Sequence, residues 1–249
     1  MSIPLIIAHR GGAKEVPENT IAALKWALDL NVDCIEIDVR LSKEGIPVVI
    51  HDPSAARMIG AVNSPHISRL TLPQIQEFDV GRSFDHTYIG ETIPTLIDVL
   101  NLNWNKTGLM IEIKKSRHPA KVLVDAVFKT LSMAKKPLPS IVMGSFSVEV
   151  IKEVQKHPRR KEFNIDMIGI VEKPDMIAHF VKQDIQRLAL WYKIITPSLI
   201  QPLINKHIDL WSFTVDDVKI AQFLISLGIN GIISNVPKTM LETHIFNLH

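Results

Sequence analysis

Two acidic side chains stand two residues apart in an apolar run of the chain. Glu36 and Asp38 lie within Cys34–Val39, and side chains alternate along a strand, so the two carboxylates share one face. Buried carboxylates this close repel each other unless a cation compensates. Oxygen ligands suit hard divalent ions, so the pair predicts a site for Mg²⁺ or Ca²⁺, with Mn²⁺ also possible. For one acid alone, an ion pair with Arg40 or a capping role is the alternative.

A second apolar run, Leu109–Lys114, carries a carboxylate and an ammonium group on one face. Glu112 and Lys114 have the same strand parity. Glu112 could complete the metal site, and Lys114 could bind a phosphate oxygen. A purely structural Glu112–Lys114 ion pair is the alternative.

Two histidines close comparable runs. His9 follows four apolar residues, and His51 ends the stretch that begins at Pro47. We expect each to stand where a barrel strand meets its C-terminal loop, the face that carries catalytic groups in α/β barrels. A pair of imidazoles that titrate near neutral pH can act as general acid and base.

Arg10-Gly11-Gly12 follows His9 directly. Arginine presents a planar fork to phosphate oxygens, and glycines let the backbone approach a ligand or simply make a turn. Acids, histidines and basic groups at strand ends together predict metal-assisted phosphoryl chemistry.

Short apolar runs alternate with longer amphipathic stretches, which is the pattern of parallel βα units and predicts an α/β fold, a (β/α)8 TIM barrel. A short segment at Val48–His51 follows the second strand. The predicted strands are Leu5–His9, Cys34–Val39, Leu109–Lys114, Ile141–Phe146, Asp166–Val171, Leu188–Trp191, Leu210–Val215 and Gly231–Ser234.

Helix-start signals separate these strands, at Glu18-Asn19-Thr20, Pro94-Thr95 and Asp216-Asp217. Residues 53–91 lack a clear βα unit and are predicted to be a short insertion after the second strand region, with a short helix at Leu72–Phe78. Without a linker or low-complexity tract, we expect one domain over residues 1–249.

The composition excludes several classes of protein. The chain has 28 basic and 26 acidic residues, which gives no clustered positive charge for nucleic acid. Its apolar runs are shorter than the roughly 20 residues of a membrane span, so no stable membrane insertion is expected. One cysteine, Cys34, and no signal peptide predict a cytoplasmic protein. The oligomeric state is left open.

The segment from Ala8 to Asp52, AHRGG…PENT…EIDVRLSKEGIPVVIHD, resembles the N-terminal signature of glycerophosphodiester phosphodiesterases, most closely the bacterial cytosolic type. Further similarity extends over nearly the whole chain, at Ile93–Leu100, Ile111–Lys114, Gly144–Phe146, Phe213–Asp217 and Gly228–Pro237.

The resemblance implies a barrel that hydrolyses glycerophosphodiesters, small-molecule substrates, to sn-glycerol 3-phosphate and an alcohol. By the family's mechanism, a substrate hydroxyl attacks phosphorus and water then opens the cyclic phosphate. The implied residues are Glu36, Asp38 and Glu112 for the divalent metal, His9 and His51 as the acid–base pair, and Arg10 and Lys114 for the phosphate.

The chain departs from the family pattern in two places. Phe213-Thr214-Val215-Asp216 stands where W-T-V-N is usual, and Ser234-Asn235 stands where Thr-Asp is common. Trp191 and Phe213 are expected to line the substrate pocket, with Phe213 as an aromatic wall. We expect neither departure to touch the proposed metal or acid–base residues, so that they affect substrate range rather than reaction class.

Two alternatives remain at this stage. A lysophospholipase D-like diesterase would need an apolar acyl groove, and a non-catalytic ligand-binding barrel is formally open. The candidate groove linings are Phe84, Trp191, Tyr192, Trp211 and Phe213.

Overall fold

The structure is a computed structural model that describes residues 4–243, and its centre is a closed barrel of eight parallel strands. The ring runs β1-β9-β8-β7-β6-β5-β4-β2 and closes by pairing of β1 with β2. The barrel strands are β1 Leu5–His9, β2 Cys34–Leu41, β4 Gly108–Ile113, β5 Ile141–Ser145, β6 Asp166–Val171, β7 Arg187–Trp191, β8 Asp209–Phe213 and β9 Gly231–Ser234. The expected (β/α)8 barrel is confirmed.

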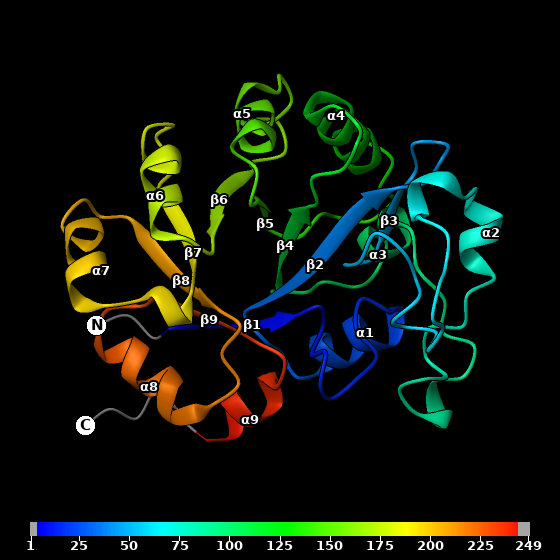
Figure 1. Cartoon of the computed structure of the whole chain (residues 1–249), viewed down its shortest axis with the longest axis horizontal. Coiled ribbons are helices and arrows are strands. Elements are labelled where there is room, and N and C mark those ends of the chain that lie inside the picture. The colour runs from blue at the N-terminus through cyan, green and yellow to red at the C-terminus, as the bar shows by residue number, and fades with distance from the viewer. Residues whose placement is uncertain (1–3, 244–249) are drawn as a thin grey trace.

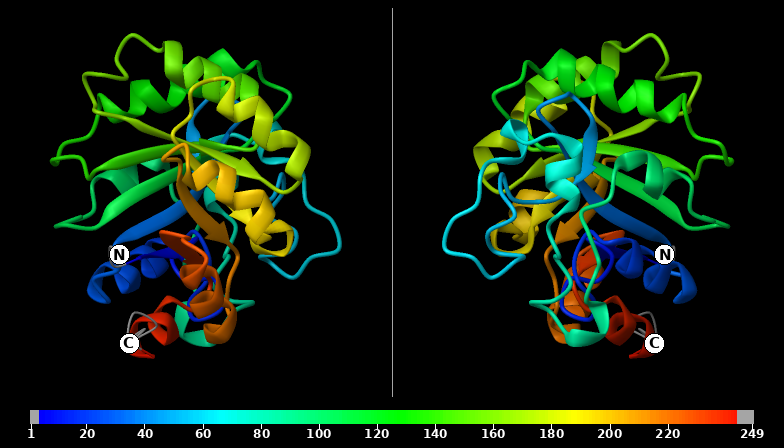
Figure 2. Two further views of the ribbon diagram at one scale, coloured as in Figure 1. Left: turned by 90° about the vertical axis from the view of Figure 1, so that its left-hand side faces the viewer. Right: turned by 90° about the vertical axis from the view of Figure 1, so that its right-hand side faces the viewer.

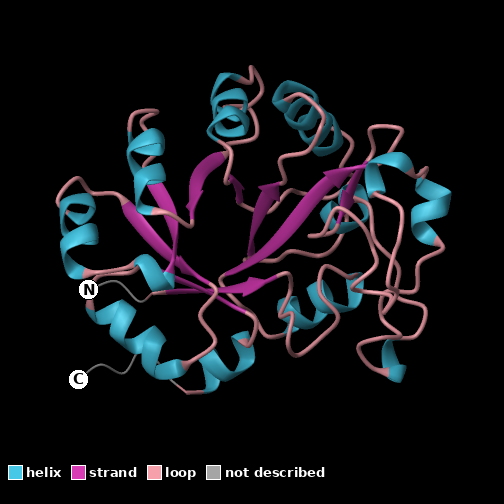
Figure 3. Cartoon of the chain, viewed as in Figure 1, coloured by secondary structure: helices cyan, strands magenta, loops and turns pink. Residues whose placement is uncertain are grey.

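Helices surround the strands on the outside of the barrel (Figures 1 and 3). They are α1 Ile21–Asp29, α2 Leu72–Gln76, α3 Leu96–Leu100, α4 Ala120–Leu131, α5 Val148–Lys156, α6 Pro174–Val181, α7 Pro197–Ile204, α8 Val218–Ser226 and α9 Pro237–Glu242. Short 3₁₀ helices occupy Ile67–Arg69, His86–Tyr88 and Tyr192–Ile194.

The predicted helix starts are confirmed by their caps. The side chain of Thr20 accepts a hydrogen bond from Ala23 N, and that of Thr95 from Asp98 N. Asp217 accepts from the backbone of Lys219 and Ile220. Each cap satisfies amide groups that the first helical turn leaves without a partner.

The segment after β2 differs from the expectation. The strand expected at Val48–His51 is β3, Pro47–Val49, which pairs antiparallel with β2 and lies outside the parallel ring. Because β3 turns back along β2, its end returns to the level of the barrel mouth, and Ile50 N donates to Asp38 O. The expectation that His51 ends a barrel strand is therefore wrong. A hairpin returns His51 to the mouth.

Residues 53–91 form the predicted insertion, and this segment projects to one side of the barrel (Figure 2). It includes α2, which confirms the short helix expected there, and the first two 3₁₀ helices. Its apolar side chains, among them Ile67, Ile75 and Val80, gather with Val48 and Ile50 in a cluster of their own. The insertion therefore packs against the β2–β3 hairpin through a small hydrophobic core that the two segments share.

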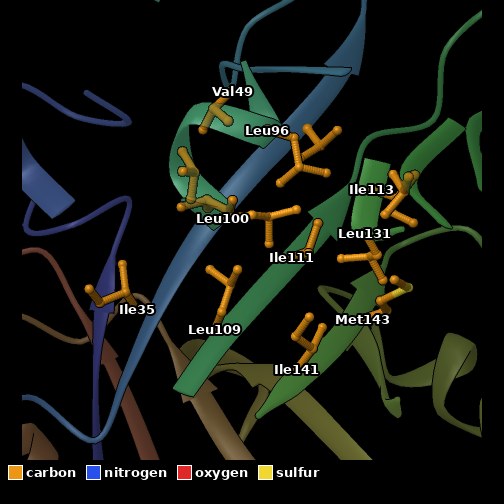
Figure 4. Packing of buried hydrophobic residues seen from close by; sticks show 14 of the residues in the cluster. Ile35, Val49, Leu96, Leu100, Leu109, Ile111, Ile113, Leu131, Ile141 and Met143 are labelled. Atoms are coloured by element: carbon orange, nitrogen blue, oxygen red, sulfur yellow. The ribbon is translucent and has the colours of Figure 1, made fainter. Parts of the chain in front are cut away.

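The two faces of the strands have different neighbours. Ile35 and Ile37 of β2 belong to one buried cluster with residues of the covering helices, such as Leu96 and Leu100. Figure 4 shows part of this cluster, including Ile35, Leu96 and Leu100. Inside the barrel, Trp211 packs with Ile7 and other inward residues. The alternation predicted for β2 is thus observed, with apolar side chains outside and Glu36 and Asp38 inside.

Over the described part of the chain, none of the helices has the length and apolar character needed to cross a bilayer.

The packing of β6 against α6 predicts a large penalty for added volume at Gly169. A β-carbon there would lie 2.6 Å from Phe180 Cγ and 2.9 Å from Leu188 Cδ2. We expect Gly169→Ala to lower the free energy of unfolding by about 1–3 kcal/mol in urea denaturation. Gly108→Ala is the matched control, because its nearest neighbour is the Ser140 hydroxyl at 3.3 Å. Equal losses in the two variants would contradict this packing.

Candidate active site

Strand register brings the predicted polar residues together at the C-terminal mouth of the barrel. His9 on β1 pairs in register with Glu36 on β2, and Asp38 on β2 pairs with Glu112 on β4. Residues in register on parallel strands share a face, so all four point inward. They surround a cavity of about 240 Å³. Its lining is His9, Arg10, Glu36, His51, Met110, Glu112, Lys114, Phe146, Ile170, Glu172, Trp191, Phe213, Thr214 and Ile233.

Eight of the nine predicted site residues line this cavity. The ninth, Asp38, has no exposed surface and contacts two of the lining side chains. Its Oδ1 lies 2.8 Å from Lys114 Nζ, and its Oδ2 lies 3.1 Å from Arg10 Nε. Asp38 therefore lies buried beneath the cavity, in contact with Arg10 and Lys114.

Glu36, Asp38 and Glu112 form the group that could hold a metal ion. One oxygen from each lies within 4.8 Å of the others. Within the described residues, Glu36 Oε1 is buried without a hydrogen-bond partner. A buried carboxylate oxygen without a partner costs free energy that a cation would recover, so these donors fit a hard divalent ion.

Burial and mutual repulsion set the charge state of this group. Burial, with Asp38 and Glu112 nearby, raises the pKa of Glu36 well above its usual value. Burial also raises the pKa of Glu112, to about 7, against the opposing effect of Lys114. For Asp38 burial acts in the same direction, but Lys114 and Arg10 hold its pKa below the ordinary range.

The predicted alternatives to a metal site are settled in part by these contacts. The Glu112–Lys114 ion pair is present, with Nζ 2.5 Å from Oε1. Lys114 also contacts Asp38, so it neutralises two carboxylates of the acidic group rather than Glu112 alone. Arg40 instead donates its Nε–H to the carbonyl oxygen of His51.

His9 is oriented by a residue whose part in the site was not expected. Its Nδ1 lies 2.6 Å from Asn235 Oδ1, which corrects the expectation that the departure at Ser234-Asn235 leaves the acid–base residues untouched. Asn235 Nδ2 donates to Asp216 Oδ2, which fixes the direction of the amide. His9 therefore donates from Nδ1, and its Nε2 is left to face the site. Burial, with Arg10 nearby, lowers the pKa of His9 to about 4.

His51 is held by a chain of charged groups. Its Nδ1 lies 2.8 Å from Asp52 Oδ1, and Arg57 donates both to Asp52 and to Glu18. Glu18 in turn accepts from Arg10. Burial lowers the pKa of His51. One network thus positions the side chains of His51 and Arg10.

The sequence contained a partial signal for this network. Glu18 and Asn19 belong to the P-E-N-T motif, and Asp52 directly follows His51. Asn19 Nδ2 donates to Asp38 Oδ2, so the motif supports the acidic group directly. Arg57 lies in the insertion and carried no such signal.

The double glycine after Arg10 forms a tight turn. Gly11 and Gly12 both have positive φ. A β-carbon on Gly11 would lie 2.8 Å from Ala23 Cβ, and one on Gly12 would lie 2.6 Å from Trp26 Cζ3. The glycines let the turn pack on α1 and direct Arg10 into the site.

Three aromatic side chains form one wall of the cavity. Trp191 and Phe213 pair in register at the ends of β7 and β8, and Phe146 meets Phe213 edge to face at 5.8 Å. Trp191 and Phe213 therefore both line the cavity. The other candidates for an acyl groove do not line the cavity: Trp211 is buried inside the barrel, Tyr192 packs with the outer core and Phe84 lies in the insertion.

Fold and site together define a (β/α)8-barrel enzyme with a carboxylate group suited to a metal, two histidines and two cationic side chains at one mouth. The sequence matches the glycerophosphoryl diester phosphodiesterase family over residues 9–239. The chain therefore belongs to this family. It is a phosphoric diester hydrolase rather than a non-catalytic barrel.

Individual relatives agree with this assignment. A glycerophosphodiester phosphodiesterase of Caldanaerobacter subterraneus subsp. tengcongensis is 34% identical over 96% of both chains. The fold is similar to that of an Oleispira antarctica phosphodiesterase solved in complex with the product sn-glycerol-3-phosphate, with a TM-score of 0.88, 23% identity and 96% of both chains covered. A Thermotoga maritima glycerophosphodiester phosphodiesterase gives a TM-score of 0.77 at 22% identity, covering 98% of this chain and 100% of the other.

The acidic group predicts opposite effects of Glu36→Gln with and without metal. In EDTA we expect the variant to melt at or above the wild-type Tm, because one of three repelling carboxylates is gone. Millimolar Mg²⁺, Ca²⁺ or Mn²⁺ should raise the Tm of the wild type by mass action and leave that of the variant unchanged. Differential scanning fluorimetry measures both, with exposed Glu77→Gln as control. A metal-dependent rise that is as large in Glu36→Gln as in the wild type would exclude Glu36 as a ligand.

Metal affinity is expected to rise with pH. Glu112, with its pKa of about 7, must lose its proton before it can bind a cation. Below that pKa, the apparent affinity should increase about tenfold per pH unit for each proton displaced, and then level off. Without metal the same raised pKa contributes stability that is present below pH 4.5 and lost as the pH rises through about 7. Calorimetry at pH 6, 7 and 8 in buffers of different ionisation enthalpy checks the proton release. Binding that is independent of pH would contradict the assignment.

Proposed function

We propose that the chain hydrolyses glycerophosphodiesters to sn-glycerol 3-phosphate and an alcohol, with a divalent metal and two histidines. The observation that carries the proposal is the meeting of Glu36, Asp38 and Glu112 with His9 and His51 around one cavity at the barrel mouth. The names of the relatives support the same substrate class.

In this proposal Glu36, Asp38 and Glu112 hold the metal, which when bound polarises the phosphoryl group and offsets negative charge in the transition state. Arg10 and Lys114 bind phosphate oxygens. Both cations are already anchored by Asp38, so they are preorganised and little reorientation accompanies substrate binding.

His9 and His51 supply the acid–base pair. A glycerol hydroxyl attacks phosphorus as one imidazole takes its proton, and the other imidazole protonates the departing alcohol. Water then adds to the cyclic phosphate with the two roles reversed. Both rings have their Nδ1 occupied, by Asn235 and Asp52 respectively, so each presents Nε2 to the cavity. Burial keeps His9 neutral near pH 7 and able to accept a proton.

This mechanism predicts a loss of turnover when either histidine is replaced. Release of sn-glycerol 3-phosphate from glycerophosphocholine, followed by a coupled dehydrogenase assay, should fall by about a hundredfold to ten-thousandfold in His9→Gln and in His51→Gln. EDTA should abolish it, and Mg²⁺, Ca²⁺ or Mn²⁺ should restore it.

His179→Gln serves as the control, because this exposed histidine lies on α6 outside the cavity. Wild-type rates in either of the two site variants, or full activity in EDTA, would refute the two-histidine or the metal component respectively. Faster turnover of a lysophospholipid than of its deacylated counterpart would instead favour the lysophospholipase D-like alternative.

A further inference from the structure

A second cavity, of about 490 Å³, opens beside the active site and is strongly cationic. It is larger than the site cavity, and its lining includes four positively charged side chains and no carboxylate. The lining is Arg40, Leu41, Pro53, His66, Ile67, Ser68, Arg69, Lys115, Ser116 and Arg117. In a chain with 28 basic and 26 acidic residues, this local excess is a marked departure from balance.

Arg69 and Arg117 in this cavity are poorly neutralised. Burial lowers the pKa of Arg40, whereas Asp38, Glu112 and Asp52 lie near enough to raise it against that effect. Among residues 4–243, no carboxylate lies within 4.0 Å of the guanidinium groups of Arg40, Arg69 or Arg117. Arg40 and Arg117 each donate to a backbone carbonyl, of His51 and Ser68, and so retain further N–H groups. Lys115 lies 3.6 Å from Glu149, but both side chains are largely exposed and their attraction is weak. The cavity therefore offers unused donors and net positive charge to an anion.

The cationic cavity adjoins the active site through consecutive residues. Lys114 lines the site, and Lys115, whose Cα is about 3.8 Å away, lines the second cavity. Arg40 follows Asp38 on the same strand face and holds the carbonyl of His51. The hydrogen bond from Arg40 to the carbonyl oxygen of His51 thus joins a residue of the cationic cavity to a residue of the active-site cavity.

The ring order of the barrel places this cavity opposite the aromatic wall. Trp191 and Phe213 end β7 and β8, and each of these strands stands three or four places from β2 and β4 around the ring. The cavity lies at the ends of β2 and β4. A phosphodiester bound between Arg10 and Lys114 can therefore direct one substituent to the wall and the other to the cations.

We propose that the cationic cavity binds a second phosphate group, carried by the alcohol portion of a glycerophosphodiester substrate. The inference rests on the proposed function and adds to it a preference for diesters whose leaving alcohol is itself anionic. Arg69 and Arg117 present planar forks that match phosphate oxygens. The same charges disfavour a cationic alcohol such as choline.

A matched pair of substrates tests the proposal on the metal-loaded enzyme. Glycerophosphoinositol and glycerophosphoinositol 4-phosphate differ by one phosphate on the alcohol. We expect kcat/KM of the wild type to be about tenfold higher for the phosphorylated member. Arg69→Gln combined with Arg117→Gln should remove this preference and change kcat/KM for glycerophosphoinositol by less than about twofold, since both side chains are exposed. Lys25→Gln with Lys129→Gln, exposed on α1 and α4, removes the same charge elsewhere and should keep the preference.

Binding of the alcohol product separates this inference from the proposed function. Calorimetric titration with inositol 4-phosphate should show weaker binding to the Arg69/Arg117 variant than to the wild type. If this difference is found but neither diester is hydrolysed, the proposed function fails and the anion site stands. If both diesters are hydrolysed with equal kcat/KM in wild type and variant, the anion site is refuted.

Competition by inorganic phosphate distinguishes a cavity that binds the phosphate of the substrate's alcohol from one that binds free phosphate. We expect it to compete more strongly against glycerophosphoinositol 4-phosphate than against glycerophosphoinositol, and to lose that difference in the variant. Inorganic phosphate could instead compete equally against both substrates while the wild type shows equal kcat/KM for the two. That outcome would assign the cavity to free phosphate and overturn the proposal.

Discussion

The repulsion among three buried carboxylates is the constraint on which the rest of this site depends, because the surrounding groups must compensate their charge. Glu36, Asp38 and Glu112 are each less than 8% exposed, and the barrel interior offers little water to screen them. Lys114 and Arg10 supply the nearest positive charge, Lys114 to both Asp38 and Glu112 and Arg10 to Asp38. This pairing keeps Asp38 ionised, whereas Glu36 and Glu112 have raised pKa values that a divalent ion would lower. The acidic group is thus arranged for a cation and is electrostatically incomplete without one.

Support for these charges extends outward in layers. Arg10 is fixed by Glu18, Glu18 by Arg57, and Arg57 also by Asp52, which holds His51. Arg57 belongs to the insertion, so this segment contributes to the position of a histidine at the mouth. Residues 53–91 therefore help to build the site, and they also form one wall of the neighbouring cationic cavity.

Two sides of the mouth have opposite chemical character. Aromatic rings at the ends of β7 and β8 line the active-site cavity together with the acidic group and Lys114, and cations at the ends of β2 and β4 line the neighbouring cavity. A barrel makes such a division possible because each strand end is fixed in position by its register with two neighbours, while the loop that follows it is free to vary.

The sequence by itself determined the features that depend on local periodicity. Alternation along β2 and β4 was sufficient to predict that Glu36 and Asp38 share the inner face and that Glu112 and Lys114 do the same. Thr20, Thr95 and Asp217 marked helix starts because capping involves residues only two or three positions apart. The strand count followed from the repeated alternation of apolar runs, and with it the barrel.

Only the tertiary structure decided which distant residues meet. Asn235 contacts His9 across 226 residues of sequence, and no periodicity links two positions so far apart. The return of β3 along β2 placed His51 by hairpin pairing rather than at the end of a barrel strand. Arg40, Arg69 and Arg117 are unremarkable in the sequence because their charges are separated along the chain. They form one cationic cavity only because the ends of β2 and β4 and the insertion fold together.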